Sequence, residues 1–156
     1  MSTTQNSADK DGLTLLRVLV VDDEPLVLET VMAILEDGFE VEACSSSTEA
    51  FKRLLHNDYD VLCTDYQMPG MSGLELVSAI EQHHLMIGAV IVTGHYLEFD
   101  RERQESPHSI PISVLLKPYR ADDLISAIRR AATFAQMKRA VGAIEGCYGG
   151  TLREPR

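Results

Sequence analysis

The chain has 156 residues, with 14 Lys and Arg against 24 Asp and Glu, which gives a formal net charge of -10 at pH 7. Because duplex binding draws most of its affinity from Lys and Arg that neutralise phosphates, this charge argues against direct binding of nucleic acid and favours a protein partner. Apolar residues make up 45% of the chain and charged residues 24%, which is typical of one soluble globular domain. No apolar run approaches the roughly 20 residues that span a bilayer. The first residues also lack the pattern of a secretion signal, so we expect no membrane insertion and a cytoplasmic location.

The three cysteines, Cys44, Cys63 and Cys147, are odd in number and widely spaced, and none belongs to a CxxC pair. This pattern predicts neither a disulfide framework nor a zinc site. Cys44 and Cys63 lie in strand-like runs, and we expect both to be small core residues.

The apolar residues predict a regular alternation of strands and helices. The run 15–21 (LLRVLVV) is typical of a buried strand, and the segment after it carries Leu28, Val31, Met32 and Leu35 at the spacing of a helix face. The unit recurs four times, with strands over 39–45, 59–65, 86–94 and 112–117 and helices over 47–57, 72–82, 95–106 and 120–141. The helix over 95–106 is weakly patterned, and we expect it to be short or irregular.

This alternation predicts an α/β fold in which a five-stranded parallel sheet is covered by helices on both faces, because parallel strands need crossover connections. The last helix is expected to pack through an inner stripe of Leu124, Ile128, Ala131 and Ala135. We expect one domain over 14–136, a flexible N-terminus over 1–13, and the end of the last helix with a flexible tail over 137–156. Gly and charged residues are frequent from Glu145 onward, which is typical of a mobile tail.

Polar residues end the apolar runs at one edge of the predicted sheet. Asp22 and Asp23 follow the first strand, and Asp65, Thr93 and Lys117 end the third, fourth and fifth runs. In sheets of this kind ligands bind beyond the carboxyl ends of the strands, so we expect these five side chains to share one crevice. An isolated Asp-Asp pair is more often a helix cap, but its grouping with Asp65 and Lys117 makes capping a minor role here.

Three carboxylates in one crevice predict a bound cation. Two unit charges roughly 4 Å apart repel by about 4 kcal/mol at an effective dielectric near 20. Oxygen ligands of this kind select a hard divalent ion such as Mg²⁺. With a metal and a lysine neutralising charge, a carboxylate can attack phosphorus and become an aspartyl phosphate, and Thr93 supplies a hydroxyl donor.

Four separated motifs carry a resemblance to a known family. The stretches VLVVDDE, CTDYQMPGMSG, VIVTG and LLKPY resemble the receiver domain (CheY-like) of bacterial two-component response regulators, over about 15–135. The resemblance implies a flavodoxin-like, doubly wound sheet of strand order 2-1-3-4-5 with five helices. It also implies a phosphorelay signalling protein that is not an enzyme beyond its own phosphorylation and dephosphorylation.

The resemblance implies a role for each residue of the crevice. Asp65 would be the phosphoacceptor, and Thr93 and Lys117 would sense the phosphoryl group. The implied Mg²⁺ ligands are Asp23 and Asp65 directly, Asp22 through a water, and the backbone carbonyl of Gln67. The family also implies a cis bond between Lys117 and Pro118.

The family likeness further implies partners. A histidine kinase or a histidine phosphotransfer protein would donate the phosphoryl group. A downstream protein target would bind the face made by the fourth helix, the fifth strand and the fifth helix. We interpret the chain as a stand-alone receiver that signals through protein contacts.

Two departures from the family pattern affect how the signal is transmitted. Many receivers have an aromatic residue three positions before the lysine, where this chain has Val114, so the usual aromatic switch is in question. Pro107 and Pro111 also interrupt the segment before the fifth strand. We hypothesise that signalling reorders 95–109 instead, because a weakly patterned segment has low local stability. Gln67 and His95 are expected to tune the lifetime of the phosphoryl group.

Three alternatives stay open at this point. One is a pseudo-receiver that keeps the fold as a phosphorylation-independent interaction module. Another is a receiver fragment of a larger hybrid kinase or transcription factor. The third, a Mg²⁺-dependent phosphohydrolase, would need substrate-binding elements that the sequence does not reveal. Arg129, Arg130, Lys138 and Arg139 make the end of the last helix basic, which is usually a solvated face but is also compatible with docking.

Overall fold

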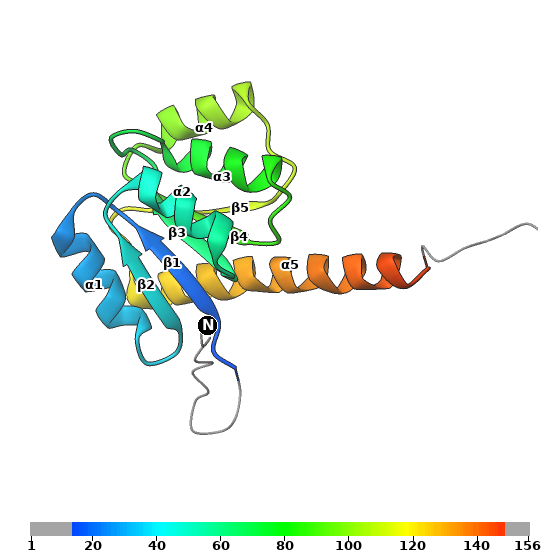
Figure 1. The fold of residues 1–156 in the computed structure, drawn as a ribbon. Helices are drawn as coiled ribbons and strands as arrows, with labels where there is room; N and C mark the ends of the chain where they lie inside the picture. The colour runs from blue at the N-terminus through cyan, green and yellow to red at the C-terminus, as the bar shows by residue number, and fades with distance from the viewer. Residues whose placement is uncertain (1–13, 149–156) are drawn as a thin grey trace, which may run out of the picture.

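The computed structural model describes residues 14–148 and forms one five-stranded parallel sheet between two layers of helices (Figure 1). The strand order is β2-β1-β3-β4-β5, which confirms the predicted fold class. The strands are β1 (Arg17–Val21), β2 (Glu40–Cys44), β3 (Val61–Asp65), β4 (Gly88–Thr93) and β5 (Ile112–Leu116). The helices are α1 (Pro25–Leu35), α2 (Ser47–His56), α3 (Gly73–Gln82), α4 (Tyr96–Glu105) and α5 (Ala121–Tyr148).

Each face of the sheet has its own hydrophobic core. Helices α1 and α5 pack on one face, where Leu35 and Ile128 are fully buried against Val18 and Val90. Helices α2, α3 and α4 cover the other face, with Leu54, Ile80 and Phe99 in one cluster. The predicted inner stripe of α5 is buried at Leu124, Ile128, Ala131 and Ala135, and so are Cys44 and Cys63. Burial on both faces explains why the strands have nearly continuous apolar sequences.

The register of the strands brings their carboxyl ends to one edge of the sheet. Val21 pairs with Thr64, so Asp22 follows β1 beside the end of β3. Thr93 pairs with Leu116, and the Lys117 backbone N–H donates to the Thr93 carbonyl at 2.9 Å. Because neighbouring strands are parallel and in this register, the polar residues predicted from sequence lie at the same edge of the sheet.

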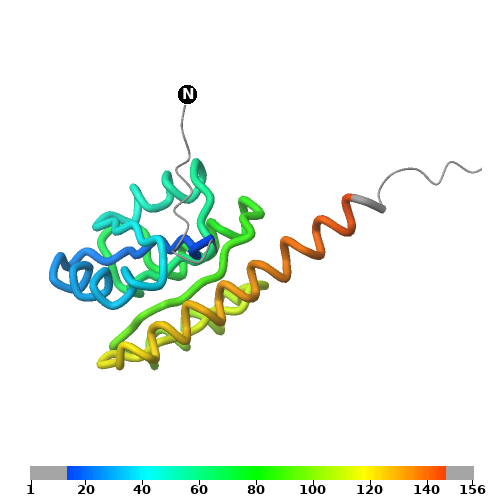
Figure 2. Tube along the Cα trace, turned by 90° about the horizontal axis from the view of Figure 1, so that it is seen from below, coloured from blue at the N-terminus to red at the C-terminus, as the bar shows by residue number. Residues whose placement is uncertain are grey.

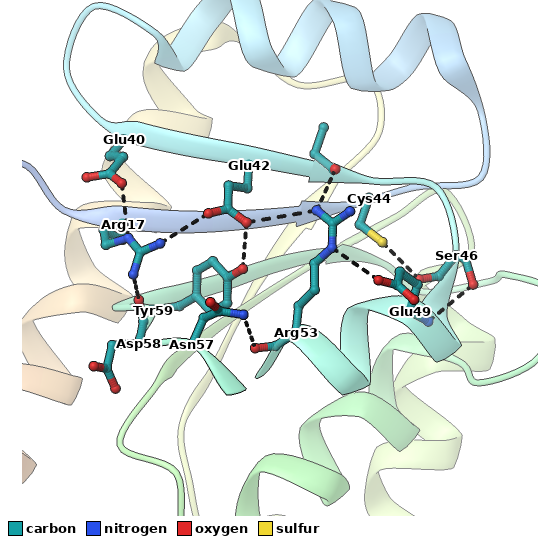
Figure 3. A network of polar contacts seen from close by, with 11 residues as sticks. Arg17, Glu40, Glu42, Cys44, Ser46, Glu49, Arg53, Asn57, Asp58 and Tyr59 are labelled. Carbon is teal, nitrogen blue, oxygen red and sulfur yellow. Dashed lines mark hydrogen bonds and ion pairs between the residues drawn. The ribbon is translucent and has the colours of Figure 1, made fainter. Parts of the chain in front are cut away.

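A polar network covers the β2 side of the sheet (Figure 3). The Arg17 guanidinium donates to the carboxylates of Glu40 at 3.2 Å and Glu42 at 3.1 Å. The Tyr59 hydroxyl donates to Glu42 at 2.6 Å, and the Arg53 guanidinium lies 3.9 Å from the same carboxylate. Since β2 is an edge strand, these charged side chains also oppose unwanted pairing with another chain.

The structure differs from two expectations about the helices. Helix α4 is regular over ten residues and ends before Pro107, although Phe99 is its one buried side chain. Helix α5 continues to Tyr148, so the tail expected from Glu145 is helical over its first four residues. The flexible N-terminus expected over 1–13, and the rest of the expected tail, lie outside the described residues.

No helix among residues 14–148 is both long enough and apolar enough to cross a membrane. The longest, α5, contains charged residues along its whole length.

Candidate functional site

Lys117 and two carboxylates meet at the carboxyl edge of the sheet. The Lys117 ammonium Nζ donates to Asp65 Oδ1 at 2.9 Å and lies 3.9 Å from Asp22 Oδ2. Asp65 ends β3, Asp22 follows β1 and Lys117 follows β5, so three strands that are separate in sequence supply the three charges. The peptide bond between Lys117 and Pro118 is cis, as the family likeness implied.

The buried carboxylate Asp22 is held in an electrostatically unfavourable place. Its residue is only 4% exposed, and burial is the main cause that raises the pKa of its side chain. The Glu24 backbone N–H, which donates to Asp22 Oδ1 at 2.9 Å, and the Lys117 charge lower that pKa, while Asp65 and Asp23 raise it further. Burial, with the charges of Asp65 and Asp23, therefore outweighs the stabilisation that the Glu24 N–H and Lys117 give to the ionised carboxylate.

The ammonium of Lys117 responds to the same carboxylates. Partial burial lowers its pKa, but the hydrogen bond and charge of Asp65, followed by the charges of Asp22 and Glu24, outweigh burial, and the pKa is raised. Lys117 is therefore a fixed positive charge at neutral pH. Glu24 was not singled out from the sequence, because an acidic residue at a helix start is most simply explained as favouring the helix dipole.

A small pocket of about 190 Å³ opens at this edge. It brings together four of the six predicted site residues with three others, and its lining is Glu24, Asp65, Gln67, Thr93, Gly94, His95 and Lys117. Thr93 is buried, and its Oγ1 accepts the His95 backbone N–H at 2.9 Å. Asp22 does not line the pocket but lies close to Lys117, which does. Asp23 is exposed and does not line the pocket.

The loop after Asp65 turns back under the strand end. Gly73 at the start of α3 donates its N–H to the Tyr66 carbonyl at 2.9 Å. A Cβ at Gly73 would lie 2.6 Å from the Asp65 carbonyl oxygen, so only glycine allows this close approach. The capping box of Ser72 and Glu75 fixes the beginning of α3. This local structure explains the turn-forming stretch MPGMSG directly after the strand.

Tyr66, the residue after Asp65, connects the site to α4. It is 3% exposed, and its ring packs edge to face on Phe99, with 5.4 Å between centroids. Its hydroxyl donates to the Glu102 carboxylate, and the Gln67 side-chain amide donates to Glu98 at 3.1 Å. Both acceptors lie on α4, one helical turn apart. No feature of the sequence predicts these contacts, because partners more than 30 positions apart leave no local pattern.

The donor groups at the site fit a hard cation. The carboxylates of Asp65, Asp22 and Glu24 act on one ammonium group, that of Lys117, and the charge of Asp23 acts on Asp22. Among residues 14–148, no three Asp, Glu, His or Cys side chains form a ready-made metal cage. Mg²⁺ does not need one, since it is commonly bound through one or two carboxylates and keeps several waters. The grouping of the Asp65, Asp22 and Glu24 carboxylates near a single ammonium group is the observation that favours a cation here.

The sheet order and this crevice define a doubly wound α/β protein with an acidic site where the strand order reverses. The family model of the response regulator receiver domain matches residues 18–129. The chain belongs to this family, whose members act as signalling modules that interact with histidine kinases and downstream targets. The family generally binds Mg²⁺ at its phosphorylation site.

Curated relatives include both regulators and kinases. The chain is 34% identical over 122 residues to the transcriptional regulatory protein NatR of Bacillus subtilis (strain 168), a match that covers 74% of this chain and 49% of NatR. It is also 34% identical over 89 residues to the signal transduction histidine-protein kinase BarA of Escherichia coli (strain K12), covering 55% of this chain and 10% of BarA. The chain thus spans half or less of the length of these relatives.

Solved structures of receivers match nearly over their full length. The response regulator receiver domain protein from Clostridium thermocellum has a TM-score of 0.70 and 33% identity, covering 79% of this chain and 98% of that one. A CheY-like receiver domain protein from Methanospirillum hungatei JF-1 has a TM-score of 0.68 and 25% identity, covering 80% of this chain and 99% of that one.

Proposed function

We propose that this receiver accepts a phosphoryl group on Asp65 from a histidine kinase or a histidine phosphotransfer protein. The observation that carries the proposal is the placement of Asp65 at the pocket, with Lys117 at 2.9 Å and Thr93 in the same lining. A carboxylate oxygen of Asp65 attacks phosphorus, a P–O bond forms, and the bond from phosphorus to the donor breaks as the leaving group takes its electron pair. The product is an aspartyl phosphate.

Lys117 and Thr93 are suited to hold the phosphorylated product. A phosphoryl group brings a negative charge of about two, which the fixed ammonium of Lys117 offsets in part. The Thr93 hydroxyl can donate its proton to a phosphoryl oxygen while its oxygen still accepts the His95 N–H. His95 is the N-cap of α4, so a movement of Thr93 toward the phosphoryl group would be passed to the start of that helix.

Asp22, Asp23, Asp65 and the Gln67 carbonyl would hold Mg²⁺ in this proposal. A bound Mg²⁺ would supply positive charge that offsets the negative charge of the carboxylates and the phosphoryl group. Asp22 is the residue best placed to keep the negative charge inside the crevice, because it is buried and the backbone N–H of Glu24 fixes its orientation.

We expect Asp22→Asn to stabilise the protein when Mg²⁺ is removed by a chelator. The pKa of Asp22 is raised by folding, so its contribution to stability is present below about pH 3.8 and is lost as pH rises through the folded pKa. At pH 7 the neutral amide, which keeps the acceptor for Glu24, should raise the melting temperature by ~2–4 °C, on the order of 1 kcal/mol.

Thermal unfolding with and without Mg²⁺ checks this prediction. Mg²⁺ should raise the melting temperature of the natural protein more than that of Asp22→Asn, because ligand binding to the folded state stabilises it. A lower melting temperature for the variant in chelator at pH 7 would contradict the electrostatic account of Asp22.

The output of the receiver is proposed to pass through the face of α4, β5 and α5 to a protein partner. Apolar side chains are exposed there on α4 and β5, with Leu97 84% exposed and Tyr96 and Leu116 partly so. Val114 is half-buried against the hydrophobic cluster that contains Phe99 of α4, and it has no aromatic ring that could switch between two positions. Tyr66 contacts Glu102 of α4, and Gln67 contacts Glu98 of the same helix. These contacts connect Asp65 to this face without an aromatic switch at position 114.

The proposed movement is confined to α4 itself. Beyond the helix, Glu81 of α3 accepts Ser109 Oγ at 2.7 Å and the Ile110 N–H at 2.9 Å, so the chain is anchored again at these residues. Burial raises the pKa of Glu81, but these hydrogen bonds outweigh it, and the pKa is lowered, as expected for a carboxylate held by several donors. Reordering on phosphorylation would therefore involve 95–106 rather than the whole of 95–109.

We expect Tyr66→Phe to weaken the link between the site and α4. The variant keeps the ring against Phe99 but leaves Glu102 without the hydroxyl, a loss of ~1 kcal/mol. Amide exchange in 95–106 should be about fivefold faster without phosphorylation, and phosphorylation should change it less than in the natural protein. Tyr59→Phe, which removes a hydroxyl bond to Glu42 at the far end of the sheet, is the matched control. Equal exchange in both variants would exclude Tyr66 from the coupling.

Intact-protein mass spectrometry tests the function itself. The purified chain is incubated with a small phosphodonor, with Mg²⁺ or with a chelator, and the modified peptide is then located. One added phosphoryl group that requires Mg²⁺ and maps to Asp65 is the expected result. Folded protein that stays unmodified would overturn the proposal and favour the phosphorylation-independent interaction module.

A further inference from the structure

The C-terminal part of α5 extends beyond the body of the domain (Figures 1 and 2). Ala135 is the last buried residue of the helix, and every described side chain over 136–146 is exposed. Arg139 still holds this part to the body, because its guanidinium donates to Asp60 Oδ1 at 2.6 Å and to the Tyr59 carbonyl at 2.9 Å. The projecting segment is a helix with nearly all of its surface in solvent.

The exposed segment carries an apolar stripe. Met137, Val141 and Ile144 are 65%, 55% and 58% exposed, and their spacing of four and three residues places them on one side of the helix. The half-buried Phe134 precedes this series by three residues, and in the sequence Tyr148 follows it by four. This is the a/d spacing of a helix that pairs with another helix.

The exposed part of α5 has low helical stability when nothing packs against it. Gly142 and Gly146 stand in its exposed part, where a Cβ added at either position would meet no packing neighbour within 4 Å. Each glycine costs about 1 kcal/mol relative to alanine in a helix. Packing of the stripe against a partner would supply the missing stability.

The charges beside the stripe indicate which partner fits. Lys138 and Glu145 lie seven residues apart on the same flank, and the small Ala140 lies on the other flank. In an antiparallel pair of identical helices, this flank faces the same flank of the second copy. Each Lys138 then meets a Glu145 of the other copy, twice in one interface, as two-fold symmetry requires. In a parallel pair the same two residues would face Thr133 and Ala140, which are uncharged.

We infer that Met137, Val141 and Ile144 form an interface with a second copy of this chain, in which the two α5 ends pack antiparallel. The three side chains offer far less than the roughly 800 Å² per partner of a standard interface. The association is therefore weak and concentration-dependent, with a dissociation constant on the order of 100 µM. It does not depend on phosphorylation of Asp65, so the two proposals fail separately.

Sedimentation equilibrium of the full chain up to about 1 mM tests this interface. The natural protein should show monomer and dimer, and Val141→Glu should raise the dissociation constant at least ~10-fold, because it places a charge in the apolar centre. Ala143→Glu adds the same charge on another side of the same helix and should leave the dissociation constant within about twofold. A natural protein that is monomeric at 1 mM, or an equal effect of the two substitutions, would overturn the interface.

Charge exchange tests the antiparallel orientation. Lys138→Glu and Glu145→Lys should each weaken the dimer about fivefold, because each places like charges opposite one another. The double variant restores opposite charges and should return to the natural dissociation constant. Circular dichroism of each variant reports whether the helix persists. Failure of the double variant to recover, with the helix intact, would overturn the antiparallel arrangement.

Discussion

Asp65→Asn is expected to abolish phosphorylation, with at least a ~100-fold loss of the phosphorylated fraction under conditions that label the natural protein. An ionised carboxylate oxygen is a nucleophile toward phosphorus, whereas the amide is uncharged and far less nucleophilic. The amide oxygen can still accept the hydrogen bond from Lys117, which is 2.9 Å from Asp65 Oδ1, so the crevice should keep its shape. Asp65→Asn should therefore remove phosphorylation without unfolding the protein.

The matched control for this substitution is Asp58→Asn. Asp58 precedes the same strand at the opposite end of the sheet, and its side chain is exposed. Intact mass measured after reaction with the small phosphodonor should show one phosphoryl group on the control and none on Asp65→Asn. The melting temperature should change little in Asp65→Asn, because the lost attraction between positions 65 and 117 is offset by the removed repulsion between positions 65 and 22. Undiminished labelling of a folded Asp65→Asn protein would move the phosphoacceptor elsewhere.

The alternation of strands and helices could be predicted because local apolar spacing reflects burial. Strands β1, β3 and β4 are buried on both faces and have almost unbroken apolar runs, while α2 shows the spacing of a half-buried helix. Helix α4 lacks such spacing. It buries only Phe99 and is held instead by polar contacts of Glu98 and Glu102 with the loop after Asp65. Such contacts depend on the tertiary fold and leave no periodic signal.

The end of α5 could not be predicted for a related reason. Gly and charged residues are frequent from Glu145 onward, so the sequence predicts a tail there. The helix nevertheless continues to Tyr148, and Arg139, near the start of its exposed part, is paired with Asp60, 79 residues earlier. The apolar stripe is evident only because the helix leaves the domain surface, which the sequence pattern does not predict.

The site was more predictable than its surroundings. Strand ends meet at one edge of any parallel sheet, so Asp22, Asp65, Thr93 and Lys117 could be grouped from their positions alone. The structure places them together, with Asp23 on the exposed rim. Their catalytic roles remain predictions that rest on family membership and on the chemistry of the groups. Tyr66 was not predicted, because an aromatic residue beside a strand end is most often an ordinary core residue.

Gly88 allows the backbones of β4 and α5 to approach closely, and the sequence alone does not reveal this contact. A glycine within a strand is typical of close backbone approach, but the partner cannot be identified from the sequence. In the structure a Cβ at Gly88 would lie 2.1 Å from the Ala131 carbonyl oxygen and 2.5 Å from its carbonyl carbon. Both atoms belong to the backbone of α5, so no side-chain rotation relieves the clash. The helix itself must move away from β4.

Gly88→Ala is therefore expected to destabilise the fold by ~3 kcal/mol or more, which lowers the melting temperature by roughly 6–12 °C. Chemical denaturation measures the free energy of unfolding, and Gly38→Ala is the control. A Cβ at Gly38 meets only the flexible Arg129 guanidinium at 3.8 Å, so that variant should stay within about 1 kcal/mol of the natural protein. Because β4 ends at Thr93 and α5 begins just after Lys117, displacement of the helix should also slow phosphorylation of the Gly88 variant. A Gly88→Ala protein as stable as Gly38→Ala would show that α5 does not pack this closely on the sheet.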